Sequence, residues 1–380
     1  MRAQKRRTTM SLKNREAEIR EKLSLITGKL MNLKMNESTN PESALASELF
    51  RRDSGIHIWD WPQGVGLYGI HKLQEVMPDP ANRAFLENWY KERFAEGLPL
   101  KNINTTAPML TLVDFIDENP AYESLAKEWA DWLLHELPKT EEGGFQHVTS
   151  GSGDGKSLIL NEQQMWVDTL FMAVLFLNRM GQKYARQDWI EEGIHQVLMH
   201  IRYLCDVHTG LFYHGWTFKE RNHFGGVFWC RGDSWFTLGI LDYLEMFGGN
   251  ISPAIRTYIL DTFRSQVKAL ASLQSPAGLW HTVLLDPGSY EETSGSAAIT
   301  AGILQGIRTG VLDPSYLETA ERAVGGILSN IAEDGTVLNV SSGTPMGMDE
   351  DFYRNIAIAP MAYGQSLTIF ALVEALRAME

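Results

Sequence analysis

The residue whose setting most strongly indicates chemistry is Asp168, the single charged residue of the apolar segment QMWVDTLFMAVLFL, residues 164–177. A carboxylate in such a segment is costly to bury unless it is paired or protonated. Burial would raise its pKa and keep it protonated near neutral pH, as a general acid requires. The residues alone leave a second interpretation open, in which Asp168 is structural and caps a helix or accepts hydrogen bonds from loop amides.

A second cluster of polar and aromatic residues lies in HFGGVFWCRGDSWF, residues 223–236. Its members are His223, Trp229, Arg231, Asp233 and Trp235. Such a cluster suits a carboxylated sugar, because a guanidinium holds the carboxylate while indole rings stack on the sugar. In the alternative interpretation, Arg231 forms an internal ion pair with Asp233, or Asp233 caps the helix that follows.

The elements that must position these residues are six apolar segments, each of which opens with a small or polar turn and continues as a helix. They cover residues 64–76, 106–116, 165–177, 231–244, 293–307 and 364–376. They are apolar on most faces, which suits burial in the centre of a ring, and amphipathic helices alternate with them. This alternation predicts an all-α fold, an (α/α)6 barrel without a large sheet, over residues 51–380. Residues 1–50 are expected to form an N-terminal helix and a polar extension.

The connections between the helices repeat as well. A glycine followed by aromatic or β-type residues occurs at Gly143, Gly210, Gly278 and Gly335. Glycine permits the turn, and the first three loops then carry His147, His214 and His281. Each loop leads into the next apolar helix, so all of them should lie at one end of the ring, where we expect the functional site. The alternative is that the aromatic residues only plug that end.

The composition restricts the expected partners. A formal net charge of -13 repels nucleic acid, anionic membranes and long polyanions, so an acidic substrate should be small. Eleven tryptophans exceed what a core needs, and tryptophan is the usual platform for sugar rings. We therefore expect a small acidic oligosaccharide as the partner, and neither nucleic acid nor a membrane. The oligomeric state is left open.

Motifs for other chemistries are missing from the sequence. Two cysteines, Cys205 and Cys230, are too few for a disulfide framework or a four-cysteine zinc site. No HExxH, P-loop or GxSxG motif occurs, and no GxGxxG follows a predicted strand. No metal or cofactor is therefore expected, and GSGDGKS at residues 151–157 is interpreted as a flexible insertion. The basic first ten residues lead into a polar helical pattern rather than an apolar run, which favours a cytoplasmic protein.

Taken together, the motifs GGFQH, QMWVD and FWCRGDSW resemble the unsaturated glycuronyl and rhamnogalacturonyl hydrolases of glycoside hydrolase families 105 and 88, with the better fit to family 105. The resemblance covers roughly residues 55–380. It implies an (α/α)6 barrel and a cofactor-free hydrolysis that removes a terminal 4,5-unsaturated uronic acid from oligosaccharides made by polysaccharide lyases. It leaves open which polysaccharide, linkage and second sugar are involved.

The resemblance also assigns roles to residues. It implies that Asp168 is the catalytic acid and base. It implies that the residues binding the unsaturated sugar come from four segments and are Trp61, Gln63, His147, His214, Trp229, Arg231 and Trp235. One departure from the family pattern lies in KNINTTAPM, where Asn104 stands in place of a second aspartate. Asparagine forms hydrogen bonds but transfers no proton, so we predict that Asn104 binds substrate and that Asp168 acts without a second acid.

Three other functions remain open from the sequence. A sugar epimerase on the same barrel would use His147, His214 or His281 as acid and base. An inverting glycosidase would need a second carboxylate, such as Asp286 or Glu292, near Asp168. A carbohydrate-binding barrel without activity would need no carboxylate at residue 168.

Overall fold

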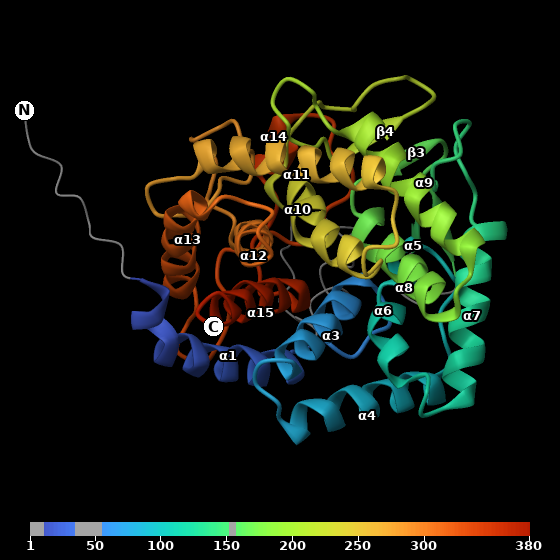
Figure 1. Cartoon of the computed structure of the whole chain (residues 1–380), viewed down its shortest axis with the longest axis horizontal. Coiled ribbons are helices and arrows are strands. Elements are labelled where there is room, and N and C mark those ends of the chain that lie inside the picture. Colours follow the sequence, from blue (N-terminus) through green and yellow to red (C-terminus); the bar gives the residue numbers. More distant parts are fainter. Residues whose placement is uncertain (1–10, 35–54, 152–156) are drawn as a thin grey trace, which may run out of the picture.

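The computed structural model describes residues 11–34, 55–151 and 157–380, and in these the helices form two concentric rings (Figure 1). Six helical segments form the inner ring. In chain order they are α3 (Trp61–Gln74), the short pair α5 (Ile103–Thr106) and α6 (Met109–Leu112), the π-helix η3 (Leu170–Val174) continued by α8 (Leu175–Tyr184), α10 (Cys230–Glu245), α12 (Thr293–Arg308) and α15 (Ala362–Arg377).

Six further helices form the outer ring and surround the inner helices in Figure 1. They are α1 (Glu16–Met31), α4 (Pro80–Glu96), α7 (Pro120–His135), α9 (Gln187–Leu204), α11 (Pro253–Leu273) and α13 (Leu317–Ser329). Each buries one apolar stripe, as α9 does with Ile194, Val197, Ile201 and Leu204 at three- and four-residue spacing. The two rings confirm the predicted (α/α)6 barrel. None of the described helices is both long and apolar enough to cross a bilayer.

The remaining described elements are short. Besides the 3₁₀ turns η1 (Leu12–Arg15), η2 (Val113–Phe115) and η4 (Pro314–Tyr316) and the helix α14 (Glu350–Arg354), there are two antiparallel hairpins. Strand β1 (Val148–Ser150) pairs with β2 (Leu158–Leu160), and β3 (Gln164–Trp166) pairs with β4 (Gly215–Thr217). The residues interpreted as a flexible insertion lie between β1 and β2, and 152–156 are outside the described residues.

Helix α1 is part of the outer ring. Its side chains Ile19, Leu23 and Ile26 are fully buried and belong to the main hydrophobic core. Helix α1 packs against α15, the last inner helix, and so closes the ring (Figure 1). The described part of the segment predicted as an N-terminal extension therefore packs on the barrel, whereas the predicted boundary at residue 50 lies outside the described residues.

The loop glycines have the conformation that the sequence repeat predicted. Positive φ angles of 88°, 81°, 92° and 82° occur at Gly143, Gly210, Gly278 and Gly335. A side chain would be strained at such angles, and it would also collide with the next outer helix. At Gly210 the collision would be with Ser265 of α11, at Gly278 with Arg322 of α13, and at Gly335 with Leu25 of α1. Each loop therefore packs its turn against the outer helix that follows it, and the last loop packs against α1.

Two inner segments depart from regular helices. The segment predicted as one helix over 106–116 is interrupted at Pro108, which has no N–H to donate and whose ring crowds the preceding turn. The segment that follows Asp168 begins as the π-helix η3, which is a rare conformation found mostly at functional sites. Both irregularities occur at the end of the barrel where the inner helices begin.

At the opposite end, polar side chains tie the inner helices together across the barrel. Asp242 of α10 accepts hydrogen bonds from Tyr68 of α3 at 3.1 Å and from Gln305 of α12 at 2.8 Å, and lies 3.4 Å from the ammonium of Lys72. The pKa of Asp242 is low despite burial, because Lys72 and these donors stabilise its charge. This network holds the end of the barrel that faces away from the loops.

Candidate active site

A cavity of about 170 Å³ opens where the inner helices begin. Its wall comes from residues far apart in the sequence: Trp61, Asn104, His147, Thr149, Ser150, Ile159, Asn161, Trp166, Asp168, Met172, Trp229, Arg231, Gly343, Thr344 and Pro345. Among these residues, Asp168 is the only carboxylate and Arg231 the only permanent cation. The predicted residues Trp61, Asn104, His147, Asp168, Trp229 and Arg231 thus share one cavity.

Asp168 lies between strand β3 and the π-helix η3, and its backbone carbonyl accepts hydrogen bonds from Phe171 and Met172. The carboxylate atom Oδ2 faces Nε2 of His214 at 3.3 Å. Both atoms are buried, yet no aligned hydrogen bond joins them or ties them to another described residue. Such loose contacts are common in unliganded active sites and tighten when substrate binds.

The sequence prediction of a raised pKa for Asp168 is wrong for this unliganded site. Burial is the largest single effect and raises the pKa of the carboxyl, but His214, together with smaller contributions from His147 and a backbone N–H, lowers it further, so that the pKa ends below its usual value. Asp168 is therefore ionised in the free site at neutral pH. Any step that needs the acid form must first bring a proton to this residue.

His147 has a different electrostatic setting. Its ring stacks on Trp166 with centroids 4.0 Å apart, and its Nδ1 lies 3.3 Å from the hydroxyl of Thr169. Burial lowers the pKa of His147 to about 3, although the charge of Asp168 opposes this. His147 is therefore neutral at physiological pH, and it can exchange hydrogen bonds with a sugar but does not bring a charge.

Arg231 does not pair with Asp233, and its Nη1 instead lies 4.0 Å from the buried carboxylate of Glu292. Its two terminal nitrogens donate to the carbonyls of Ser341 and Ser342, both at 2.8 Å, to the hydroxyl of Thr344 at 2.9 Å and to the hydroxyl of Ser341. Asp233 instead accepts hydrogen bonds from the backbone of Phe212 and from Gln266. The guanidinium therefore holds the loop at 341–344 that forms one side of the cavity.

One donor of Arg231 remains. Its Nε–H is buried and has no partner among the described residues, and the same is true of the indole N–H of Trp229, over which the guanidinium lies at 4.4 Å. Both residues line the cavity. The site therefore has two N–H donors without partners among the described residues, beside a guanidinium whose charge is shared with Glu292, rather than a two-pronged guanidinium clamp.

Three residues predicted to bind substrate lie behind the wall rather than in it. Gln63 is fully buried and donates to the backbone of Gly55, and Trp235 is fully buried with its ring against that of Trp61, centroids 6.2 Å apart. His214 is 3% exposed and contacts the Asp168 carboxylate from the side that faces away from the cavity. None of the three lines the cavity, so they belong to the layer that supports the wall.

Asn104 lies on the cavity wall in the short helix α5, which the side chain of Asn102 caps. Beside it, the hydroxyl of Ser150 donates to the buried carboxylate of Asp60 at 2.9 Å. Sequence reasoning missed this acid, and it missed Trp166 of the wall, although QMWVD places Trp166 two residues before Asp168. The wall residues 343–345 carry no sequence motif that could have indicated them.

The other residues considered from the sequence lie outside the wall. His281 bonds the backbone of Ser289, and His223 bonds that of Tyr203. Asp286 is paired with Arg354 at 2.7 Å. Glu292 is fully buried and caps α12 by accepting hydrogen bonds from Ser294 and Gly295. Neither acid is placed to act as a second carboxylate in this cavity.

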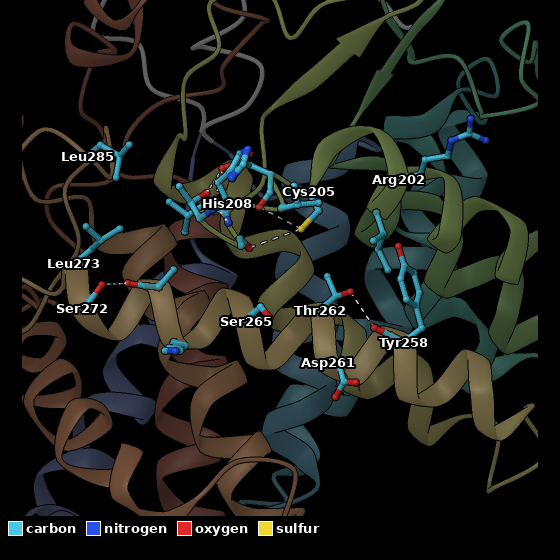
Figure 2. Close-up of a pocket in the computed structure, with 18 residues that line it drawn as sticks. Arg202, Cys205, His208, Tyr258, Asp261, Thr262, Ser265, Ser272, Leu273 and Leu285 are labelled. Atoms are coloured by element: carbon cyan, nitrogen blue, oxygen red, sulfur yellow. Dashed lines mark hydrogen bonds between the residues drawn. The ribbon is translucent and has the colours of Figure 1, made fainter.

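A larger hollow of about 860 Å³ lies outside the barrel, between the loop after α9 and helix α11 (Figure 2). Its two acidic residues are engaged in local structure. Asp206 accepts two hydrogen bonds from Thr209 within a turn, and Asp261 pairs with Arg264 on the same helix. This hollow is therefore larger than the first cavity, but its acidic groups do not converge on a common point as the polar groups of the first cavity do.

Comparison with known proteins agrees with the motifs. The family model for Glycosyl Hydrolase Family 88 matches residues 34–379. The unsaturated rhamnogalacturonyl hydrolase YesR of Bacillus subtilis is 32% identical over 322 residues, which make up 84% of this chain and 90% of that protein.

Two solved structures are also similar. A possible member of the GH105 family from Salmonella enterica has a TM-score of 0.88 at 36% identity, over 99% of this chain and 97% of that chain. Another from Klebsiella pneumoniae has a TM-score of 0.86 at 38% identity, over 100% of this chain and 96% of that chain. With the fold, the motifs and these relatives in agreement, the chain belongs to the family 88 and family 105 group of glycoside hydrolases.

Proposed function

We propose that this enzyme removes a terminal 4,5-unsaturated uronic acid from short oligosaccharides by hydrating the C4=C5 bond. The observation that carries the proposal is the single carboxylate, Asp168, in a cavity that also presents Arg231 and three tryptophans. Ordinary glycoside hydrolysis uses two carboxylates, whereas hydration of an enol ether needs only one group that first gives and then takes a proton. The relative YesR is itself an unsaturated rhamnogalacturonyl hydrolase, in support of this substrate class.

The proposed reaction starts at C4, because the ring oxygen on C5 makes the C4=C5 bond an enol ether. Asp168 in its acid form donates a proton to C4, and positive charge develops at C5 and the ring oxygen. Water adds to C5 and returns a proton to the Asp168 carboxylate. The product is a hemiketal, which opens to a ketone at C5. The hemiacetal left at C1 then breaks down and releases the second sugar, so the net change is the addition of one water molecule.

The low pKa of Asp168 in the free site requires that substrate binding supplies the acid form. A bound uronate adds a negative charge and displaces water, and both changes raise the pKa of a neighbouring carboxyl. We therefore expect proton uptake on binding. Because kcat/KM reports the free enzyme, it should fall as pH rises above the low pKa of Asp168.

The remaining wall residues would hold the sugar. The Nε–H of Arg231 and the indole N–H of Trp229 are the buried donors available to the substrate carboxylate. Trp61 offers a ring face that is itself supported by Tyr363, whose ring stacks on it at 4.5 Å. Asn104 and the neutral His147 would exchange hydrogen bonds with the sugar hydroxyls.

The first test is incubation with unsaturated disaccharides prepared with polysaccharide lyases, starting with rhamnogalacturonan fragments. Hydration destroys the conjugated C4=C5–carboxylate chromophore, so ultraviolet absorbance should fall while the second sugar is released. Retention of the absorbance with every such substrate would overturn the proposal. Conversion of a saturated sugar into its epimer would instead support the epimerase interpretation.

Replacing His147 with glutamine separates these two interpretations further. Since burial keeps His147 neutral, we expect its loss to raise KM several-fold while the pH dependence of kcat/KM keeps its shape. Steady-state kinetics across pH measure both quantities. An epimerase that used His147 as acid or base would instead lose turnover in this variant and retain it when Asp168 is replaced.

The substitution Asn104→Asp restores the acid that the family pattern contains. A second carboxylate on the same cavity wall should raise the pKa of Asp168 through like-charge repulsion. The fall of kcat/KM should therefore move to higher pH, and KM for the anionic substrate should increase. Asn250→Asp, at an exposed position, controls for one added charge. An Asn104→Asp profile identical to that of the wild type would show that Asn104 does not act on Asp168.

A further inference from the structure

Tyr353 connects the short helix α14 to the catalytic cavity. Its hydroxyl lies 2.8 Å from Nδ1 of His214, the ring whose other nitrogen faces Asp168 at 3.3 Å. Tyr353 is 1% exposed and 139 residues away from His214 in the chain. A buried series of contacts therefore runs from Tyr353 through His214 to Asp168.

The direction of the Tyr353 hydrogen bond follows from its neighbours. The backbone N–H of Gly347 donates to the Tyr353 oxygen at 3.1 Å, so this bond uses the oxygen as an acceptor. The hydroxyl proton has two acceptors near it, the thioether of Met346 at 3.8 Å and the imidazole nitrogen of His214 at 2.8 Å. A thioether is a weak acceptor, and the imidazole nitrogen is also much closer. A hydrogen bond from the Tyr353 hydroxyl to Nδ1 of His214 is therefore the stronger of the two arrangements open to its proton.

A neutral imidazole carries a single proton, so the acceptance of a hydrogen bond at Nδ1 leaves that proton on Nε2. We propose that Tyr353 is a positioning residue, which fixes the proton of His214 on Nε2 and so directs an N–H group at the carboxylate of Asp168. The inference rests on the function proposed above, because it concerns how Asp168 is prepared for proton transfer.

The groups around His214 show why this matters. Asp168 faces Nε2, Tyr353 faces Nδ1, and Trp166 and Trp229 cover the ring with centroids at 5.3 Å and 4.7 Å. The charged or titratable groups beyond these are His147, which is near Asp168, and Arg231, which lies over Trp229. With the proton on Nδ1 instead, the lone pair of Nε2 would face the carboxylate and repel it. The tautomer of His214 therefore controls whether Asp168 is held in place or pushed away.

The position of Tyr353 is well supported. The next residue, Arg354, pairs with Asp286 at 2.7 Å, and the Tyr353 ring packs on Trp229 at 5.7 Å. The same stretch of chain supplies Thr344 and Pro345 to the cavity wall. The loop that Arg231 holds and the residue that orients His214 thus belong to one continuous segment.

The test compares Tyr353→Phe with Tyr243→Phe in the full-length enzyme. Both substitutions remove one buried hydroxyl, but that of Tyr243 has no hydrogen-bond partner among the described residues and lies outside the cavity wall. We expect Tyr353→Phe to lower kcat about 3- to 10-fold, the range expected for one lost hydrogen bond, with little change in KM. The pH profile of kcat/KM should also shift. Tyr243→Phe should change neither.

A second measurement does not depend on activity. With ¹⁵N-labelled histidine, the two ring nitrogens report which of them carries the proton, and the His214→Gln variant identifies the signals of His214 among the ten histidines. We expect the wild-type signal to show the His214 proton on Nε2, and this preference for Nε2 to be lost in Tyr353→Phe. An unchanged ring signal in Tyr353→Phe would overturn the inference.

The two proposals fail in different ways. If no unsaturated oligosaccharide is hydrated, the proposed function fails, whereas the ring signal still tests the role of Tyr353. If hydration occurs but Tyr353→Phe keeps both the wild-type pH profile and the ring signal, only the role of Tyr353 fails. A loss of kcat that Tyr243→Phe shares equally would likewise count against the positioning role.

Discussion

The Asp168→Asn variant is expected to fold, to bind an unsaturated disaccharide, and to lose kcat by about 10²- to 10⁴-fold. This is the contribution of a positioned general acid and base to a proton-transfer step. Asparagine has nearly the size of aspartate and can still accept a hydrogen bond, but it carries no transferable proton. Because Asp168 is the only carboxylate in the wall, no second acid among the wall residues can replace it.

The decrease in ultraviolet absorbance measures turnover, and quenching of tryptophan fluorescence measures binding. Asp261→Asn serves as the matched control, because Asp261 is exposed and, among the described residues, forms an ion pair with Arg264 of its own helix. Turnover close to that of the wild type in a correctly folded Asp168→Asn enzyme would refute both the proposed mechanism and the assignment of this cavity. Loss of turnover in Asp168→Asn but not in Asp261→Asn would support the mechanism and the assignment of the cavity.

Replacing Arg231 with methionine is expected to affect both stability and binding. The side chain is 1% exposed, and its terminal nitrogens satisfy the carbonyls of Ser341 and Ser342. Removal of one member of a buried polar network typically costs about 3–5 kcal/mol of unfolding free energy. Since Arg231 also brings the only permanent positive charge to the wall, binding of the acidic sugar should weaken by about 2–3 kcal/mol.

Thermal unfolding measures the first effect, and KM of the folded fraction at low temperature measures the second. Arg264→Met is the control, because Arg264 lies half-exposed on α11 and an exposed ion pair contributes little. An Arg231→Met enzyme with an unchanged unfolding midpoint would show that the loop at 341–344 does not depend on this residue. An unchanged KM would show that the substrate carboxylate binds elsewhere.

The sequence was sufficient for features that are encoded locally. The apolar segments and their amphipathic neighbours predicted the two rings, and the loop glycines predicted the turns at which positive φ angles occur. Asp168 stood out because its own neighbours are apolar. The interruption at Pro108 and the packing of α1 against α15 were not predicted, although proline in the middle of the segment was a local signal.

Features that depend on distant contacts were missed or wrong. The pKa of Asp168 is lowered by His214, which follows 46 residues later and whose proximity no local pattern indicates. The partners of Arg231 lie about 110 residues away, in a loop without a motif, whereas Asp233 was the nearest acid in the sequence. Tyr353 was not considered for the same reason. Electrostatic environments are set by the assembled site, and the sequence indicates only some of its members.

The polar network around Asp242 has a consequence for how sugars move through this enzyme. Because Tyr68, Lys72 and Gln305 tie the inner helices together at the far end, we expect the cavity to be closed there and to open only at the end that carries the loops. A polysaccharide cannot thread through it, so we expect action only at chain tips and no processive sliding. Entry and exit share one path, and each product must diffuse out before the next molecule enters. High product concentrations should therefore inhibit competitively.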